Sequence, residues 1–160
     1  MTIAQGFLEE LKQEAESTRK LLERVPFEKS DWKPHEKSMP LNRLSSHVAE
    51  NFEWIAMTIE TEELDFKKQE YKPFIPKTTE ELIKFFDDCY AKGEKALTNC
   101  SDEEMMKNWT MRSGEEVYFT VPKMVMIRNF CINHMIHHRG QLTVYLRLLG
   151  VPLPGIYGPT

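Results

Sequence analysis

Five histidines are the residues of this sequence best suited to chemistry, and three of them crowd into the stretch HMIHH: His134, His137 and His138. His134 and His138 are four residues apart, so on a helix their imidazoles lie one turn apart on one face. Metal sites on helices use this spacing because both rings can reach a single ion. Met135 occupies the position where a zinc-protease HExxH motif places its glutamate, which excludes that motif. The spacing predicts a metal site with no adjacent general base.

His137 is an alternative partner for His134. At about 100° per residue, His138 lies within about 40° of the helix line that carries His134. His137 lies about a quarter-turn from that line and is interpreted as a flank residue. Residues three apart on a helix are also neighbours, so helical geometry by itself leaves both pairings open.

His47 falls on the apolar stripe of a second predicted helix, so it too is expected to face the core. Burying three imidazoles without compensation is costly, and an ion shared by His47 and two histidines of the last helix would remove that cost. Cys131, one turn before His134, could be a further ligand, although a free cysteine more often packs as a small core residue. His35 lies in a proline-rich loop and is assigned no role.

Three polar residues near the expected site are candidate catalytic or substrate-positioning groups. Asn51 lies one turn after the histidine of the second helix, and Gln141 and Tyr145 share the face of the HxxxH pair. Each can hydrogen-bond a ligand or a second reactant, and each is also compatible with a place at the edge of the core. Arg139 and Arg147 are interpreted as solvated or ion-paired.

Four segments carry apolar residues every three or four positions, the pattern of amphipathic helices. They cover residues 2–25, 44–59, 78–97 and 122–149. Thr2 and Thr78 open the first and third helices with capping boxes, and Gly150 and Pro152 stop the last. These helices must position the histidines.

Shorter elements are expected between the third and last helices. Ser101 begins a second S-x-x-E pattern, which can start a short turn. Ser113 and Gly114 then provide turn residues between Trp109-Thr110 and the alternating stretch 117–121, which predicts a β-hairpin. The sequence therefore predicts an all-α fold, a four-helix bundle with a small β-hairpin before the last helix.

Composition bounds the class of protein. The 160 residues suit one domain, residues 1–160, and 41% hydrophobic with 29% charged residues is typical of globular chains. A net charge of −4 provides no positive field for phosphate backbones, so no nucleic-acid partner is expected. The first residues do not resemble a signal peptide, and no apolar stretch approaches the ~18 residues of a membrane span. The three cysteines lack CxxC spacing, and their odd number argues against a disulfide framework. We expect no membrane partner and a cytoplasmic location.

Two stretches resemble the DinB-like (DinB/YfiT) helical-bundle family. In HMIHHRGQLTVYLRLLGVPLPGIYGP the family's H-x-x-x-H-R-G-Q pattern falls on residues 134–141, and LNRLSSHVAEN contains His47. The segment ESTRKLLERVPFEKSDWKPHEKSMP is also similar to the family's first helix and following loop. The resemblance implies an up-up-down-down bundle, often a homodimer, with a divalent metal held by His47, His134 and His138. It thereby implies His138 rather than His137.

The resemblance also implies a class of activity, since characterised relatives include transferases and isomerases that use low-molecular-weight thiols such as bacillithiol or mycothiol. Three neutral imidazoles leave open positions on a divalent ion, where a thiol or a water loses its proton near neutral pH. A thiol leads to an S-transferase acting on a small-molecule substrate, and water leads to a hydrolase. The lack of a well-placed carboxylate base favours the thiol. Zn or Ni is the expected metal because imidazoles are borderline ligands.

A non-catalytic protein is the alternative function. In that interpretation the chain is a metal-binding stress-response or protein-interaction module whose metal is structural. A closed site with four ligands would support it, and Cys131 is the one obvious candidate for the fourth ligand on the face of the last helix.

Overall fold

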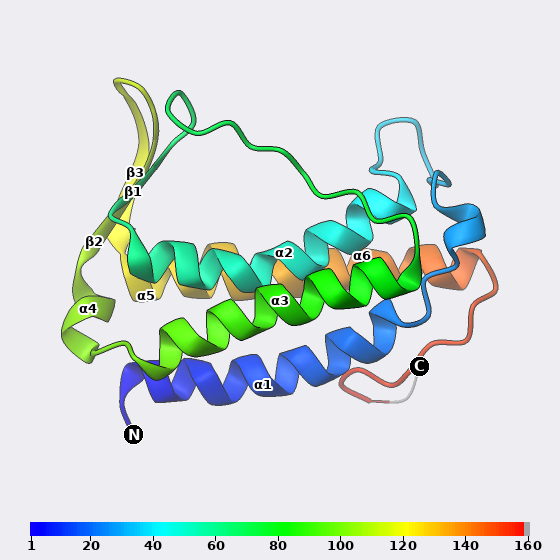
Figure 1. Ribbon diagram of the computed structural model, residues 1–160, viewed down its shortest axis with the longest axis horizontal. Coiled ribbons are helices and arrows are strands. Elements are labelled where there is room, and N and C mark those ends of the chain that lie inside the picture. The colour runs from blue at the N-terminus through cyan, green and yellow to red at the C-terminus, as the bar shows by residue number, and fades with distance from the viewer. Residues whose placement is uncertain (159–160) are drawn as a thin grey trace.

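Four long helices form a bundle in the computed structural model, which describes residues 1–158 (Figure 1). They are α1 Ile3–Leu22, α2 Leu41–Glu60, α3 Thr79–Thr98, and a last helix made of α5 Lys123–Met126, a π-helical segment Ile127–Ile132 and α6 Asn133–Leu148. The shorter elements are a 3-10 turn Phe27–Lys29, helix α4 Asp102–Met106, and strands β1 Glu63–Asp65, β2 Asn108–Ser113 and β3 Glu116–Pro122. The predicted fold class is confirmed.

Side-chain caps begin several helices where the sequence predicts them. Thr2 forms a complete capping box with Gln5. The hydroxyls of Thr78 and Ser101 each accept a hydrogen bond from the backbone N–H three residues later, which begins α3 and α4. Helix α2 begins directly after Pro40, three residues earlier than predicted, because the fixed φ of proline leads into the helix.

The helices run up, down, down and up, which corrects the expected up-up-down-down order (Figure 1). Glu10 of α1 pairs with Arg128, and further along Thr18 contacts Met135, so α1 and the last helix point the same way. A compact connection reverses the chain between α1 and α2. The connection 61–78 instead crosses the length of the molecule and returns the chain to the start of a helix parallel to α2. Loop composition does not reveal which end of the bundle a loop reaches.

The predicted hairpin is present but belongs to a three-stranded sheet. β2 and β3 pair antiparallel, and Gly114 makes the turn with φ of 62°, a conformation that favours glycine. β1 adds to β2 in parallel, which the sequence does not predict because its three residues lie in a charged stretch. Buried Asp65 secures β1 by accepting hydrogen bonds from the backbone N–H groups of Gly114 and Lys67.

The last helix is not α-helical throughout, which corrects the prediction of one regular helix over residues 122–149. The π-helical segment Ile127–Ile132 inserts an extra residue into the turn, so the face before it is offset from the face after it. Residues from Asn133 onward return to regular α-helix. The i,i+4 relation of His134 and His138 is therefore preserved.

Two contacts fix the positions of α2 and α6 against their neighbours. Gly93 of α3 lies so close to α2 that a Cβ there would be 2.5 Å from the carbonyl oxygen of Phe52. On the other side, the buried guanidinium of Arg139 lies 2.5 Å from Glu14 of α1 and donates to the hydroxyl of Thr18 at 3.0 Å. Arg139 is thus ion-paired, as predicted, and Arg147 is exposed.

Within residues 1–158, no helix combines the length and the apolar character needed to cross a membrane. The long helices are amphipathic, and their apolar faces meet in the core between them.

The close approach at Gly93 gives a prediction about stability. Gly93→Ala should lower the free energy of unfolding by about 1–3 kcal/mol, because the new methyl group meets backbone and cannot be accommodated by a rotamer change. Urea unfolding followed by circular dichroism measures this.

The matched control is Gly6→Ala, also inside a helix, where an added Cβ meets nothing within 4 Å. This variant should gain up to about 1 kcal/mol from helix propensity. Equal effects of the two substitutions would show that α2 and α3 are not in close contact at Gly93.

Candidate metal centre

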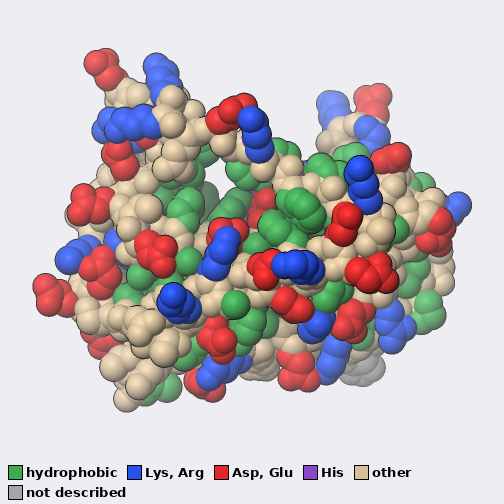
Figure 2. Space-filling view, viewed as in Figure 1, with side chains coloured by type: hydrophobic (Ala, Val, Ile, Leu, Met, Phe, Trp, Pro, Cys, Tyr) green, Lys and Arg blue, Asp and Glu red, His purple; other side chains and the backbone are tan. Residues whose placement is uncertain are grey.

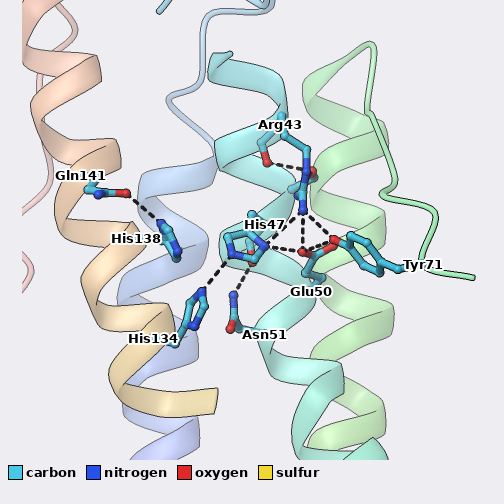
Figure 3. A network of polar contacts seen from close by, with 9 residues as sticks. Arg43, His47, Glu50, Asn51, Tyr71, His134, His138 and Gln141 are labelled. Carbon is cyan, nitrogen blue, oxygen red and sulfur yellow. Dashed lines mark hydrogen bonds and ion pairs between the residues drawn. The ribbon is translucent and has the colours of Figure 1, made fainter. Parts of the chain in front are cut away.

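Three imidazoles converge between α2 and α6 (Figure 3). Nε2 of His47 lies 3.0 Å from Nε2 of His134, and one ring nitrogen from each of His47, His134 and His138 lies within 4.8 Å of the others. The ring of His138 is centred 4.5 Å from each of the other two rings. His47 is buried, and the two histidines of α6 are half-buried.

This donor set fits a divalent transition metal. Two nitrogens bound to one tetrahedral zinc at about 2.0–2.1 Å would be roughly 3.3 Å apart, close to the 3.0 Å separation of the two Nε2 atoms. Nδ1 of His47 contacts Glu50, and Nδ1 of His138 lies 2.7 Å from the Gln141 carbonyl oxygen. A carboxylate and a carbonyl oxygen both accept, so each Nδ1 carries the proton and each Nε2 keeps its lone pair for an ion. The three histidines could hold a metal ion.

The protonation of the rings also suits a metal. Burial, together with the neighbouring imidazoles, lowers the pKa of His134 to about 4. Burial lowers the pKa of His138 as well, against the opposing effect of its hydrogen bond with Gln141. At pH 7 both rings are therefore neutral, which is the form that binds a cation.

Glu50 organises the outer side of the site. Its Oε1 accepts hydrogen bonds from Nδ1 of His47, from Arg43 at 2.9 Å and from the hydroxyl of Tyr71 at 2.6 Å (Figure 3). Burial opposes ionisation of Glu50, but the hydrogen bonds from His47, Tyr71 and Arg43 outweigh it and lower the pKa of the carboxyl group. Glu50 is therefore an ionised orienting group for His47, in the manner of carboxylate–histidine–metal arrangements.

Asn51 lies beside the histidines, one turn along α2. Its Nδ2 donates to the backbone carbonyl of His47 at 2.5 Å. Its Oδ1 is buried and has no hydrogen-bond partner within residues 1–158. An unpaired buried acceptor is costly, so this oxygen is available to a bound group.

The other candidates occupy different positions. Gln141 is exposed and bridges the two adjacent histidines, with its Nε2 3.1 Å from Nε2 of His137. Tyr145 lies nearly two turns beyond His138 along α6, where its hydroxyl donates to the carbonyl of Met39 at 3.2 Å and its ring packs edge-on against Trp32. The structure therefore brings Gln141 to the histidines and places Tyr145 in a separate packing contact.

Cys131 lies deeper in the bundle. It is buried, and its sulfur lies 3.9 Å from the Thr58 hydroxyl. Burial raises the pKa of the Cys131 thiol to about 12, so it stays protonated at neutral pH. Its sulfur is not among the donor atoms that lie within 4.8 Å of one another at the three histidines. His35 is exposed in its loop, as expected.

Sequence reasoning missed Glu50, Arg43 and Tyr71. The spacing in the sequence could have identified two of them. Arg43 lies four residues before His47 and Glu50 three residues after it, so both share its helix face. Tyr71 had no such signal, since it reaches Glu50 from the connection 61–78, whose path is set by tertiary structure.

Comparisons with known proteins agree with this architecture. The sequence matches the DinB family over residues 1–160. It is 30% identical over 156 residues to the uncharacterized protein YrdA of Bacillus subtilis (strain 168), a match that covers 96% of this chain and 87% of that protein.

Solved structures share the fold. A DinB-like protein from Bacillus cereus superposes with a TM-score of 0.73 at 23% identity, covering 96% of this chain and 97% of that one. The DinB-like protein YjoA from Bacillus subtilis gives a TM-score of 0.73 at 19% identity, covering 96% and 98%. At these identities the likeness concerns the fold alone.

The site geometry predicts unequal roles for two adjacent histidines. His138→Ala removes one of three converging nitrogens and should weaken metal binding by orders of magnitude. His137→Ala removes a contact to Gln141 and an edge-on ring contact to His138, for which about 10–100-fold is the expected ceiling. Competition with a chromophoric chelator measures both affinities, with one Zn²⁺ or Ni²⁺ per chain expected for the unmodified protein. Equal losses would show that the donor set is assigned to the wrong pair.

Proposed function

The chain belongs to the DinB family, and from that premise we propose that it is a divalent-metal-dependent S-transferase that joins a low-molecular-weight thiol to a small electrophile. The observation that carries the proposal is the group of three imidazoles within 4.8 Å, to which the described residues add no fourth His, Cys, Asp or Glu donor. A three-histidine set leaves coordination positions for a substrate, which is the arrangement of catalytic rather than structural sites.

His47, His134 and His138 would hold the ion, with Zn²⁺ or Ni²⁺ preferred by borderline imidazole ligands. When bound, such an ion supplies a positive charge that lowers the pKa of a coordinated thiol or water. Glu50 would keep His47 in the required orientation and tautomer through Nδ1. Asn51 would offer its unpaired Oδ1 to a bound group, and Gln141 would hold the ring of His138.

The state of Glu50 supports a thiol rather than a water as nucleophile. Hydrolysis benefits from a general base, yet the buried Glu50 already accepts three hydrogen bonds and has a lowered pKa, so it is a poor proton acceptor. A thiolate needs no such base. In the proposed reaction the thiol releases its proton to solvent, its sulfur forms a bond to the electrophilic carbon, and the leaving group departs with the electron pair of the broken bond.

Two alternative functions make different predictions from the transferase. A hydrolase would use the same imidazoles with water as nucleophile. A non-catalytic metal-binding module would need a closed site, and Cys131, whose sulfur lies by the Thr58 hydroxyl, is not among the converging donors.

We also propose that the protein works in the cytoplasm as a homodimer. Its three cysteines are free thiols, which suits a reducing compartment where small thiols are abundant. Along α6, Val144 and Leu148 are 56% and 61% exposed and line an apolar groove of about 450 Å³ with the C-terminal segment. A second copy would cover this surface. The net charge of −4 supports a small-molecule rather than a nucleic-acid substrate.

The transferase proposal predicts metal-dependent conjugation. Zn²⁺- or Ni²⁺-loaded protein should join bacillithiol or mycothiol to chlorodinitrobenzene, followed by absorbance of the thioether and by mass spectrometry. Replacing His47, His134 and His138 together by Ala should lower the rate at least about 100-fold, the scale expected for loss of a central electrostatic stabiliser. His35→Ala, an exposed histidine in a loop, is the control and should keep the rate. Unchanged rates in the triple variant would exclude the proposal, and release of the phenol without thiol incorporation would identify a hydrolase.

The dimer proposal has its own test. Val144→Glu places a charge in the apolar groove and should convert a dimer at micromolar concentration into a monomer in sedimentation velocity. Lys84→Glu, on the exposed side of α3, is the control and should leave the dimer intact. Unmodified protein that sediments only as a monomer would contradict the proposal.

A further inference from the structure

A cleft with a cavity volume of about 320 Å³ opens next to His47. Its walls come from α2, from strands β1 and β2, from α5 and from residues 66–72 of the long connection. Figure 2 shows a hollow beneath this connection with hydrophobic side chains around it. The volume is at the lower end of the range for small-molecule sites, so it suits one ring or a short chain.

The inner wall of the cleft is apolar. Six side chains form it: Trp54, Met57, Leu64, Phe66, Met111 and Met126. Three of the six are methionines, whose flexible, polarizable side chains adapt to ligands of different shape and make favourable contacts with aromatic rings. The wall therefore favours an apolar ligand without dictating one exact outline.

The charged side chains at the rim neutralise one another. Arg43 lies 2.9 Å from Glu50 and also contacts the Tyr71 hydroxyl. Lys72 lies 3.3 Å from Glu70. A ligand with a charge of its own would have to enter an apolar space without a free partner, which is costly. The rim therefore favours an uncharged ligand.

The cleft meets the metal centre at two side chains. His47 lines it directly. The ring of Trp54 forms another part of its wall and packs edge-on against His47 and His134, with ring centres 5.5 and 5.4 Å apart. A molecule in the cleft would thus lie against the imidazoles that are proposed to hold the ion.

We propose that this cleft binds the second substrate, an uncharged, apolar electrophile such as an aryl or alkyl compound with a leaving group. The inference rests on the proposed S-transferase function and specifies its acceptor. The reacting carbon would face His47, where the thiol sulfur forms its bond as the leaving group takes the electrons of the broken bond. The apolar part of the molecule would contact the methionines.

The test measures binding without turnover. Meta-dinitrobenzene is uncharged, aromatic and lacks a leaving group, and nitroaromatics quench tryptophan fluorescence. Titration should show saturable quenching, and Trp54→Phe should remove most of its amplitude because Trp54 lines the cleft. Dinitrobenzoate, which adds only a carboxylate, should bind at least about tenfold more weakly. Quenching that is unaffected by Trp54→Phe, or equal affinity for dinitrobenzoate, would overturn the assignment.

Matched variants test whether the ligand binds among the methionines of the cleft. Met57→Arg on α2 and Met111→Arg on β2 put a charge in the cleft from two different elements, and each should weaken binding at least about tenfold. Met57→Leu keeps apolar volume and should stay within about threefold. Met106→Arg changes an exposed methionine outside the cleft, and both its affinity for the probe and its circular dichroism should match the unmodified protein. Unchanged affinity in both cleft variants would exclude the cleft as the binding site.

The cleft assignment and the proposed transferase function can fail independently of each other. Binding of the probe with the expected variant effects, but no thiol conjugation, would retain the cleft as a site for apolar molecules and reject the transferase. Conjugation of chlorodinitrobenzene that is unaltered by Met57→Arg and Met111→Arg would retain the transferase and reject this cleft as its electrophile site.

Discussion

Where α2 passes α6, Nε2 of His47 and Nε2 of His134 face each other at 3.0 Å, and the rest of the site is arranged around that approach. Two neutral imidazoles whose lone pairs point at one another repel unless a proton or a cation lies between them. The hydrogen bond from Nδ1 of His47 to Glu50 leaves its Nε2 as an acceptor, and burial keeps His134 neutral. A cation shared with His138 would satisfy all three rings at once.

Glu50 connects this centre to the surface of the molecule. It orients His47 and, through the hydroxyl of Tyr71, ties down the connection that forms one wall of the neighbouring cleft. Because Arg43 pairs with the same carboxylate, Glu50 stays ionised although it is buried. One side chain therefore orients His47 and holds the loop that forms one wall of the cleft.

The bundle holds the histidines in place from both sides. Gly93 allows α3 to pack directly against α2, and the buried pair of Arg139 with Glu14 fixes α6 against α1. A buried ion pair contributes little net stability compared with apolar packing, but it is costly to break and so fixes the register of the two helices. The position of one imidazole against another depends on that register.

The sequence by itself determined the helices, their caps, the hairpin and the spacing of His134 and His138, because these depend on residues a few positions apart. It also placed His47 on a core-facing stripe, and it predicted the fold class and family. Tertiary structure decided the features that involve distant segments. Among these are the helix directions, the third strand, the role of Glu50, and the separation of Tyr145 from the histidines, where it hydrogen-bonds Met39 instead. Periodicity reports which face of a helix is buried, whereas the contacts along that face depend on how far each neighbouring helix is shifted and on where a long loop comes to rest.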